Sequence, residues 1–268
     1  MFTHCPPKEL PNLESVTQAD GKRYYVTPNG KRLPSVTTVV GAKKKQVIME
    51  WRKRVGEVEA NRISKLATGR GNRVHLLAEK YINNEKIIWQ KEMPDAVEMF
   101  RTLIKPMQNI NNTHYQEQAL WSEGLGMAGR VDLIAEWNGV LSVIDFKTSK
   151  KLKTASDVPE YFAQCTAYAC MYEELVGTPI DQIVVLMAVE NEQPLVFIEK
   201  TQDHLNNLLD HILLFHSCWK RSLCYRFVNH RKILIWHFLK FLVCICRHLL
   251  IILDFIFQVA IFVFPQIY

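Results

Sequence analysis

The sequence lacks a cysteine framework. Its seven cysteines form no C-x-x-C pair and follow no regular spacing. Small secreted domains held by disulfides, and zinc sites built from paired cysteines, both show such spacing. We therefore expect reduced thiols in an intracellular protein.

The first 21 residues also lack the features of a targeting leader. They are polar and Pro-rich, and they carry Glu9, Glu14 and Asp20. A secretory signal has an apolar centre, and a mitochondrial transit peptide is poor in acids. We expect no signal or transit peptide here and a cytoplasmic location, which would be the host cytoplasm if the source is a virus.

No uninterrupted apolar run reaches the roughly 20 residues that cross a bilayer. Residues 222–268 come nearest, because this tail is dense in Ile, Leu, Phe and Val. Its apolar runs within 233–264 are short or are interrupted by Asp254 and Gln258. We interpret the tail as an extension without a selected structure, and membrane contact through 233–264 is the alternative.

Acidic residues are scarce between Lys22 and Arg73. This stretch has 14 Lys or Arg against three Glu, whereas the whole chain carries a net charge of only +6. Such clustering is typical of a surface that binds phosphates, although a solvated helix face can look similar.

What the sequence does contain is a charged hairpin at residues 129–149. Apolar and polar residues alternate through 131–136, Asn138-Gly139 supplies a tight turn, and 140–146 is a second, largely apolar strand. With 268 residues, the chain is long enough for one domain with a substantial core, or for a domain plus an appendage.

Three ionisable side chains stand in this hairpin. Asp132 lies in the first strand, and Asp145 and Lys147 share one face of the second, because strand side chains two apart point the same way. Buried charges are usually matched to each other or to a metal ion. The alternative is a surface hairpin with solvated ion pairs, which the apolar run before Asp145 disfavours.

The pattern G-x-V-D followed by D-F-K resembles the core of the PD-(D/E)XK nuclease superfamily, in its RecB-like branch. The resemblance implies that Asp132, Asp145 and the Phe146 carbonyl hold Mg²⁺, for which Mn²⁺ substitutes. It implies that Lys147 positions or activates the attacking water. Some RecB-like nucleases carry an iron–sulfur cluster, but the cysteines for it are missing here, and we expect none.

Further motifs occur in the order that this branch shows. G-x-x-x-H ends at His75, which the resemblance places beside the metal in a catalytic role. Q-x-x-x-Y spans Gln164 and Tyr168, which lie four apart on one helical face and would bind substrate. The resemblance implies that Gln164 holds either the substrate or the catalytic carboxylates by hydrogen bonds. Glu117, in the strand 114–122, is expected near the active centre on the substrate side. Each of these residues could instead be structural.

The N-terminal stretch KRYYVTPNGKRLPSVTTVV, residues 22–40, is similar to a segment of phage exonucleases and mitochondrial genome maintenance exonucleases. Its turn, Thr27 to Gly30, predicts a short basic hairpin. A plain edge hairpin is the alternative. The basic residues that follow are assigned to binding DNA: Lys43, Lys44, Lys45 and Arg70.

These assignments compose an α/β fold, a PD-(D/E)XK or restriction-endonuclease-like core with a mixed sheet flanked by helices. Periodicity predicts helices at 46–65, 69–82, 93–107, 157–176 and 203–221, and a final strand pair at 183–189 and 195–199. Asp157 is expected to cap its helix. Apolar residues expected to face inward include Val47 and Val58 in the first helix and Leu209 and Leu213 in the last. We expect an irregular N-terminal arm (1–21), the nuclease domain (22–221) and the tail (222–268).

The resemblance implies a metal-dependent DNA exonuclease that prefers single strands or free ends. The alternatives are a structure-specific or sequence-specific endonuclease, a DNA-binding module without activity, and a membrane-attached protein whose function lies in the tail.

Overall fold

The computed structural model describes residues 1–19 and 21–223. Five strands form the central sheet, in the spatial order β4 (Ile110–Ser122), β5 (Met127–Trp137), β6 (Val140–Ser149), β7 (Gln182–Val189) and β8 (Leu195–Lys200). The β6 and β7 strands are parallel, and the other neighbours are antiparallel. The predicted α/β class with a mixed sheet is therefore confirmed.

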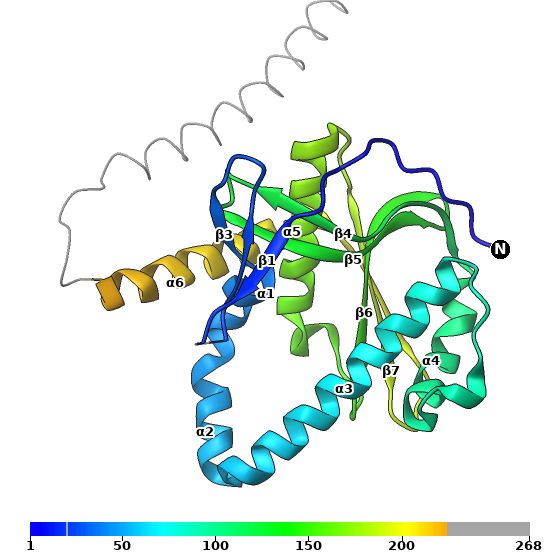
Figure 1. Cartoon of the computed structure of the whole chain (residues 1–268), viewed down its shortest axis with the longest axis horizontal. Helices are drawn as coiled ribbons and strands as arrows, with labels where there is room; N and C mark the ends of the chain where they lie inside the picture. The colour runs from blue at the N-terminus through cyan, green and yellow to red at the C-terminus, as the bar shows by residue number, and fades with distance from the viewer. Residues whose placement is uncertain (20, 224–268) are drawn as a thin grey trace, which may run out of the picture. The chain divides into compact units, whose positions relative to one another are not determined.

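Helices cover both faces of this sheet (Figure 1). On one face, α3 (Glu57–Ile82) and α4 (Pro94–Met107) bury an apolar layer against β5, β6 and β7. On the other, α1 (Val36–Val40), α5 (Pro159–Val176) and α6 (Leu205–Leu223) do the same. The α5 helix supplies the crossover that a parallel strand pair requires between β6 and β7.

A small second sheet comes first in the chain. It consists of β1 (Glu14–Thr17), β2 (Arg23–Val26) and β3 (Arg32–Pro34), all antiparallel. Tyr25 and Leu33 are buried against Ala119 and Ala128 of the central sheet. The basic hairpin is confirmed, but β1 was missed within the segment expected to be irregular. Its four side chains are all exposed, so its sequence has no apolar alternation.

A bend between two helices differs from the prediction. The expected helix at 46–65 is instead α2 (Lys45–Val55) followed by α3, which runs on without a break through 82. Gly56 separates them with a φ of +89°, a value that favours glycine. Val47 and Val58, expected to face inward, are 65% and 87% exposed, because this stretch projects from the core.

Smaller elements complete the chain. These are η1 (Gly41–Lys44), η2 (Trp89–Lys91), η3 (Ala155–Asp157) and η4 (Thr201–His204). Asp157 completes a capping box with Thr154 in η3 and does not cap α5, which begins at Pro159. Within α6, Leu209 and Leu213 were expected to face inward and are exposed.

No helix of the described part is long and apolar enough to span a membrane. Of the predicted tail (222–268), residues 224–268 lie outside the part of the chain that the structure describes.

The charged hairpin at residues 129–149 forms as predicted. Asn138 and Gly139 both have positive φ, as the tightest two-residue hairpin turn requires, and they join β5 to β6. Gly129 lies at the other end of the hairpin, under the Tyr168 ring of α5. A Cβ at Gly129 would meet the Tyr168 hydroxyl at 2.7 Å and Cε1 at 2.9 Å. This glycine is therefore required by the packing of the hairpin against α5.

We expect Gly129→Ala to lower the melting temperature by roughly 2–10 °C, because overpacking a buried site costs about 1–3 kcal/mol. The matched control is Gly71→Ala in α3. A Cβ there meets only the Thr148 hydroxyl, at an ordinary 3.5 Å, and alanine favours a helix by about 1 kcal/mol. Thermal denaturation followed by circular dichroism should show a loss for the first variant and none for the second. Equal losses would contradict this assignment.

Candidate active site

The site begins where two central strands separate. β5 and β6 pair from Trp137 and Val140 as far as Leu133 and Ile144, and no further. Beyond that point, the backbone N–H of Phe146 donates to Oδ2 of Asp132 at 2.9 Å instead of to a strand carbonyl. The Asp132 carboxylate thus replaces a backbone acceptor, and this fixes its position at the opening between the strands.

Asp145 lies on β6 at this opening and is only 1% exposed. Its Oδ2 forms an ion pair with Lys147 Nζ, and its Oδ1 accepts a hydrogen bond from Gln164 Nε2 of α5 at 3.1 Å. The Lys147 ammonium also lies 5.1 Å from the centre of the Tyr161 ring. Asp145 and Lys147 therefore share one face of β6 as predicted, and the Gln164 side chain contacts the Asp145 carboxylate.

These buried charges have altered proton affinities. Burial raises the pKa of Asp145 to about 6, with the Asp132 charge adding to the effect and Lys147 opposing it. Burial alone would lower the pKa of Lys147, but the charges of Asp145 and Asp132 outweigh it and raise the pKa. Lys147 is accordingly held as a cation that donates hydrogen bonds.

His75 reaches the same opening from α3. Its Nδ1 lies 3.3 Å from Asp132 Oδ2, and its ring makes an edge contact with Phe146. Burial would lower the pKa of His75, but the Asp132 carboxylate outweighs it and raises the pKa. In turn, burial would raise the pKa of Asp132, and His75 and Lys147 reverse that direction.

Glu117 of β4 is the third side chain beside His75 and Asp132. One ligand atom from each of these residues lies within 4.8 Å of the others. Burial, together with the nearby charges of Asp132 and Glu79, raises the pKa of Glu117 to about 7. The sequence placed Glu117 near the centre, and the structure brings it to the group that could hold a metal ion.

The donor set suits a divalent cation. Carboxylate oxygens are the preferred ligands of Mg²⁺ and Mn²⁺, and an imidazole is accepted by Mn²⁺. The raised pKa values of Asp145 and Glu117 reflect carboxylates crowded into a buried space beside Asp132. A cation relieves that crowding. The residues present therefore fit the metal that the resemblance implies.

Tyr168 lies one helical turn beyond Gln164 but packs under Gly129, with 2% of its surface exposed. Its structural packing role is clear, and its predicted contact with substrate stays a prediction. Tyr161 was missed by the sequence reasoning. Its position three residues before Gln164, on the same face of α5, was the available signal.

The predicted DNA-binding lysines belong to η1 and α2, which contribute no side chain to the group described above. Lys43, Lys44 and Lys45 are exposed in η1 and at the start of α2, and Lys44 forms an ion pair with Glu160 of α5 at 3.0 Å. Their role in binding substrate stays a prediction.

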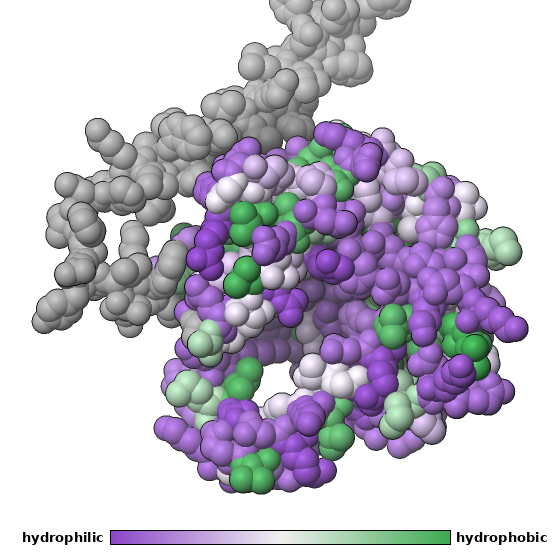
Figure 2. Space-filling view, in the orientation of Figure 1, coloured by the Kyte–Doolittle hydropathy of each residue, from purple (hydrophilic) through white to green (hydrophobic). Residues whose placement is uncertain are grey.

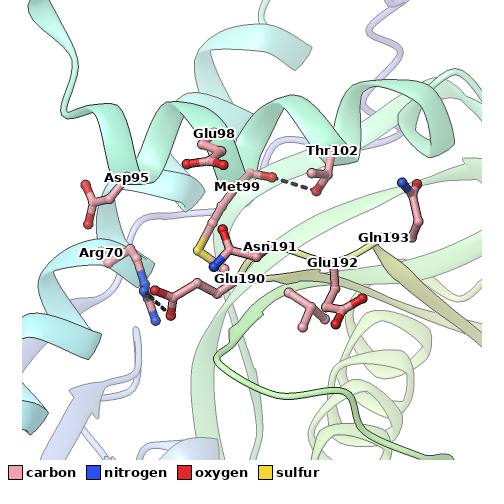
Figure 3. Close-up of a pocket in the computed structure, with 10 residues that line it drawn as sticks. Arg70, Asp95, Glu98, Met99, Thr102, Glu190, Asn191, Glu192 and Gln193 are labelled. Atoms are coloured by element: carbon pink, nitrogen blue, oxygen red, sulfur yellow. Dashed lines mark hydrogen bonds and ion pairs between the residues drawn. The ribbon is translucent and has the colours of Figure 1, made fainter.

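Arg70 is the fourth residue assigned to binding DNA, and this role also stays a prediction. It is buried on α3, and its Nη1 pairs with Glu190 Oε2 at 2.9 Å at one end of a cleft of about 480 Å³ (Figure 3). Asp95, Glu98 and Glu192 also line this cleft, so its lining is acidic. Sequence reasoning missed Glu190, whose charge offsets that of Arg70 in the free protein.

The fold and the site together define a nuclease core of the type in which two strand aspartates and a lysine meet. The chain belongs to the PD-(D/E)XK nuclease superfamily, whose family model matches residues 48–216. No curated protein gives a significant match.

Two solved structures are similar at low identity. The protein SSO0001 aligns with a TM-score of 0.37 and 14% identity, over 67% of this chain and 75% of its own. A candidate exonuclease from Eubacterium rectale aligns with a TM-score of 0.34 and 14% identity, over 63% of this chain and 77% of its own.

Replacements of Asp132 should separate its expected role in cleavage from its role as the hydrogen-bond acceptor of the Phe146 N–H. Asp132→Asn keeps an oxygen that accepts from the Phe146 N–H, whereas Asp132→Ala leaves that buried donor unpaired at a cost of about 1–3 kcal/mol. We expect both variants to lose cleavage and only the alanine variant to lose several degrees of melting temperature. Thermal denaturation without metal is the measurement. If the two variants melted alike, the hydrogen bond would not hold the strand opening in place.

Proposed function

We propose that this protein is a DNA exonuclease of the RecB-like branch, dependent on Mg²⁺ or Mn²⁺ and acting on single strands or free ends. The ordered motifs ending at His75, Asp132, Lys147 and Tyr168 support the branch. The similarity of residues 22–40 to a segment of the phage and mitochondrial genome maintenance exonucleases supports the choice of substrate.

One observation carries the proposal. Residues from three elements converge where β5 and β6 separate: His75 from α3, Asp132 from β5, and the Asp145–Lys147 pair from β6. Two carboxylates, an imidazole and an ammonium in one partly buried opening match the needs of phosphodiester hydrolysis. Such a reaction requires a cation near the phosphate and a positioned water.

The cation would be held by Asp132, Asp145, the Phe146 carbonyl and His75. When bound, a divalent cation polarises the scissile phosphate and makes water more acidic. Lys147 donates hydrogen bonds toward the attacking water and offsets the negative charge that develops on the phosphate. Gln164 holds the Asp145 carboxylate, and Tyr161 limits the positions of the Lys147 ammonium.

The shape of the projecting arm favours a substrate with a free end. We define the arm as residues 41–68, which comprise η1, α2 and the first part of α3. No residue of α2 is buried. Figure 2 shows the surface hollowed between the bend of the arm and the rest of the domain. A single strand is thin and flexible enough to enter such an opening from its end.

The arm is also rich in basic residues. Lys44, Arg52 and Arg62 pair with acids, namely Glu160, Glu57 and Glu59. The other basic residues of the arm form no ion pair with a described residue: Lys43, Lys45, Lys53, Arg54 and Lys65. These side chains are free to contact phosphates.

The deciding experiment compares linear and circular single-stranded DNA of one sequence in Mg²⁺ or Mn²⁺. We expect the linear strand to be degraded from an end and the circle to survive. Asp145→Asn and Lys147→Ala should each lower the rate at least about 100-fold while DNA binding persists, because each removes a group needed in the transition state. Cleavage of the circle would indicate an endonuclease, and near-normal turnover of both variants would contradict the site.

A double variant controls for folding. Removing only one member of the buried Asp145–Lys147 pair leaves an uncompensated charge, which costs about 3–5 kcal/mol. Asp145→Asn combined with Lys147→Met removes both charges and keeps most of the volume. We expect it to be inactive and to melt above the Lys147→Ala variant, so that lost activity is separated from lost structure.

Substrate affinity should depend on the base of the arm. Replacing Lys43, Lys44 and Lys45 with Ala should reduce the slope of log affinity against log salt by about 1.4 to 2, since each phosphate contact on a single strand contributes about 0.7 and Lys44 contributes only when it leaves Glu160. The rate at saturating DNA should change little, because these side chains lie outside the catalytic group.

The control for this variant replaces three exposed lysines elsewhere, Lys86, Lys105 and Lys200. Fluorescence anisotropy at several salt concentrations would measure both slopes. An unchanged slope for the arm variant would show that its lysines are only solvated surface.

A further inference from the structure

His211 of α6 is a buried side chain without a polar partner. It is 2% exposed, and within the described part of the chain neither Nδ1 nor Nε2 has a hydrogen-bond partner. A neutral imidazole carries one donor and one acceptor, and leaving both unpaired in a protein core is unfavourable. An apolar side chain would fill this place at lower cost. The histidine here therefore indicates a use for its ability to bind a proton.

His211 lies beside the ion pair of Lys44 and Glu160. Asn207, one helical turn earlier on the same face of α6, donates a hydrogen bond to the Pro159 carbonyl at 2.7 Å. Glu160 is the next residue of α5, and its side chain, 13% exposed, pairs with Lys44 at 3.0 Å. Four charged groups from three elements act on His211: Lys43 and Lys44 of η1, Glu160 of α5, and Asp210 of α6 itself.

These charges oppose one another in the free protein. Burial lowers the pKa of His211, the two lysines add to that effect, and the Glu160 and Asp210 carboxylates counteract it. His211 is therefore neutral at pH 7, because even its ordinary pKa is only about 6.5. If Lys44 turned to a phosphate, its repulsion of an imidazolium would end, and the Glu160 carboxylate would be left without a cation in a mostly buried place. Both changes favour a proton on His211.

We propose that His211 takes up one proton from solvent when Lys44 leaves Glu160 to bind a phosphate of the DNA. The imidazolium then supplies the positive charge that the Glu160 carboxylate requires. This inference rests on the proposed function, since it concerns the binding of DNA at the base of the arm. Because the pKa of His211 is higher in the complex than in the free protein, affinity for DNA rises as the pH falls between these two pKa values.

The test counts protons and needs no cleavage. The full-length protein is titrated calorimetrically with a single-stranded oligonucleotide in EDTA, at a pH of about 6.5, in two buffers of different ionisation enthalpy. The difference in observed heat gives the number of protons taken up per complex. His211→Phe keeps the ring and cannot titrate, so we expect it to take up fewer protons than the wild type, by as much as one. His211→Leu repeats the test with a smaller side chain.

The pH dependence of affinity is the second readout. Through the titration of His211, the affinity of the wild type should gain up to about 10-fold per unit fall in pH relative to His211→Phe, which is the limit for one linked proton. Fluorescence anisotropy between about pH 5.5 and pH 8 would measure it. A purely structural role of His211 would change the melting temperature and leave this slope unaltered.

Lys44→Ala tests the coupling itself. Without this lysine, the repulsion is absent before DNA binds, so proton uptake should fall as it does in His211→Phe. The double variant should take up no fewer protons than either single variant, because both remove the same event. The matched control is His114→Phe. His114 of β4 is half-buried, burial lowers its pKa, and its Nδ1 lies 2.8 Å from the Tyr172 hydroxyl. This control should take up as many protons as the wild type.

The outcomes distinguish this inference from the proposed function. Equal proton uptake by the wild type and His211→Phe, with DNA bound by both, would overturn the inference alone. Normal uptake in Lys44→Ala would also overturn it, since the proton would then not depend on that lysine. A wild type that neither binds nor cleaves single strands would overturn the proposed function as well.

Discussion

The structure depends on keeping two like charges close together in a place from which water is largely excluded. Asp145 is almost fully buried, and Asp132 lies across the gap between β5 and β6. Such an arrangement is stable only if each carboxylate has its own partners. Asp145 has Lys147 on its own strand and Gln164 on α5, while Asp132 has the Phe146 N–H and His75. The separation of the two strands makes room for all of them.

The surrounding fold follows from this requirement. α5 must lie close to the hairpin for Gln164 to reach Asp145, and the absence of a side chain at Gly129 allows Tyr168 to pack there. α3 must cross the other face so that His75 reaches Asp132. The two apolar layers that hold these helices are therefore also what positions the polar groups. The two glycines of the recognised motifs differ in this respect, because Gly71 has room for a methyl group and Gly129 does not.

Sequence predicted the hairpin, its Asn138-Gly139 turn and the grouping of Asp145 with Lys147, because these depend on residues close together in the chain. It also predicted the α/β class, through motifs in a fixed order. It failed where the outcome depends on distant packing. The periodicity of Val47 and Val58 could not reveal that no core lies beneath the arm. The ion pair of Arg70 with Glu190 was not predicted, because it joins residues 120 positions apart. Nothing in the sequence indicated the positive φ of Glu117, because glutamate is not a residue that favours this conformation.

The pairing of Asp145 with Lys147 on one strand also constrains how such a protein can evolve. A single substitution at either position leaves a buried charge without its partner and is therefore expected to reduce stability, in addition to any effect on cleavage. A lineage that abandons hydrolysis but keeps the fold is therefore expected to replace both residues together, or to pass through a destabilised ancestor. We therefore expect the intact pair to be retained even under weak selection for activity, because folding itself selects for it.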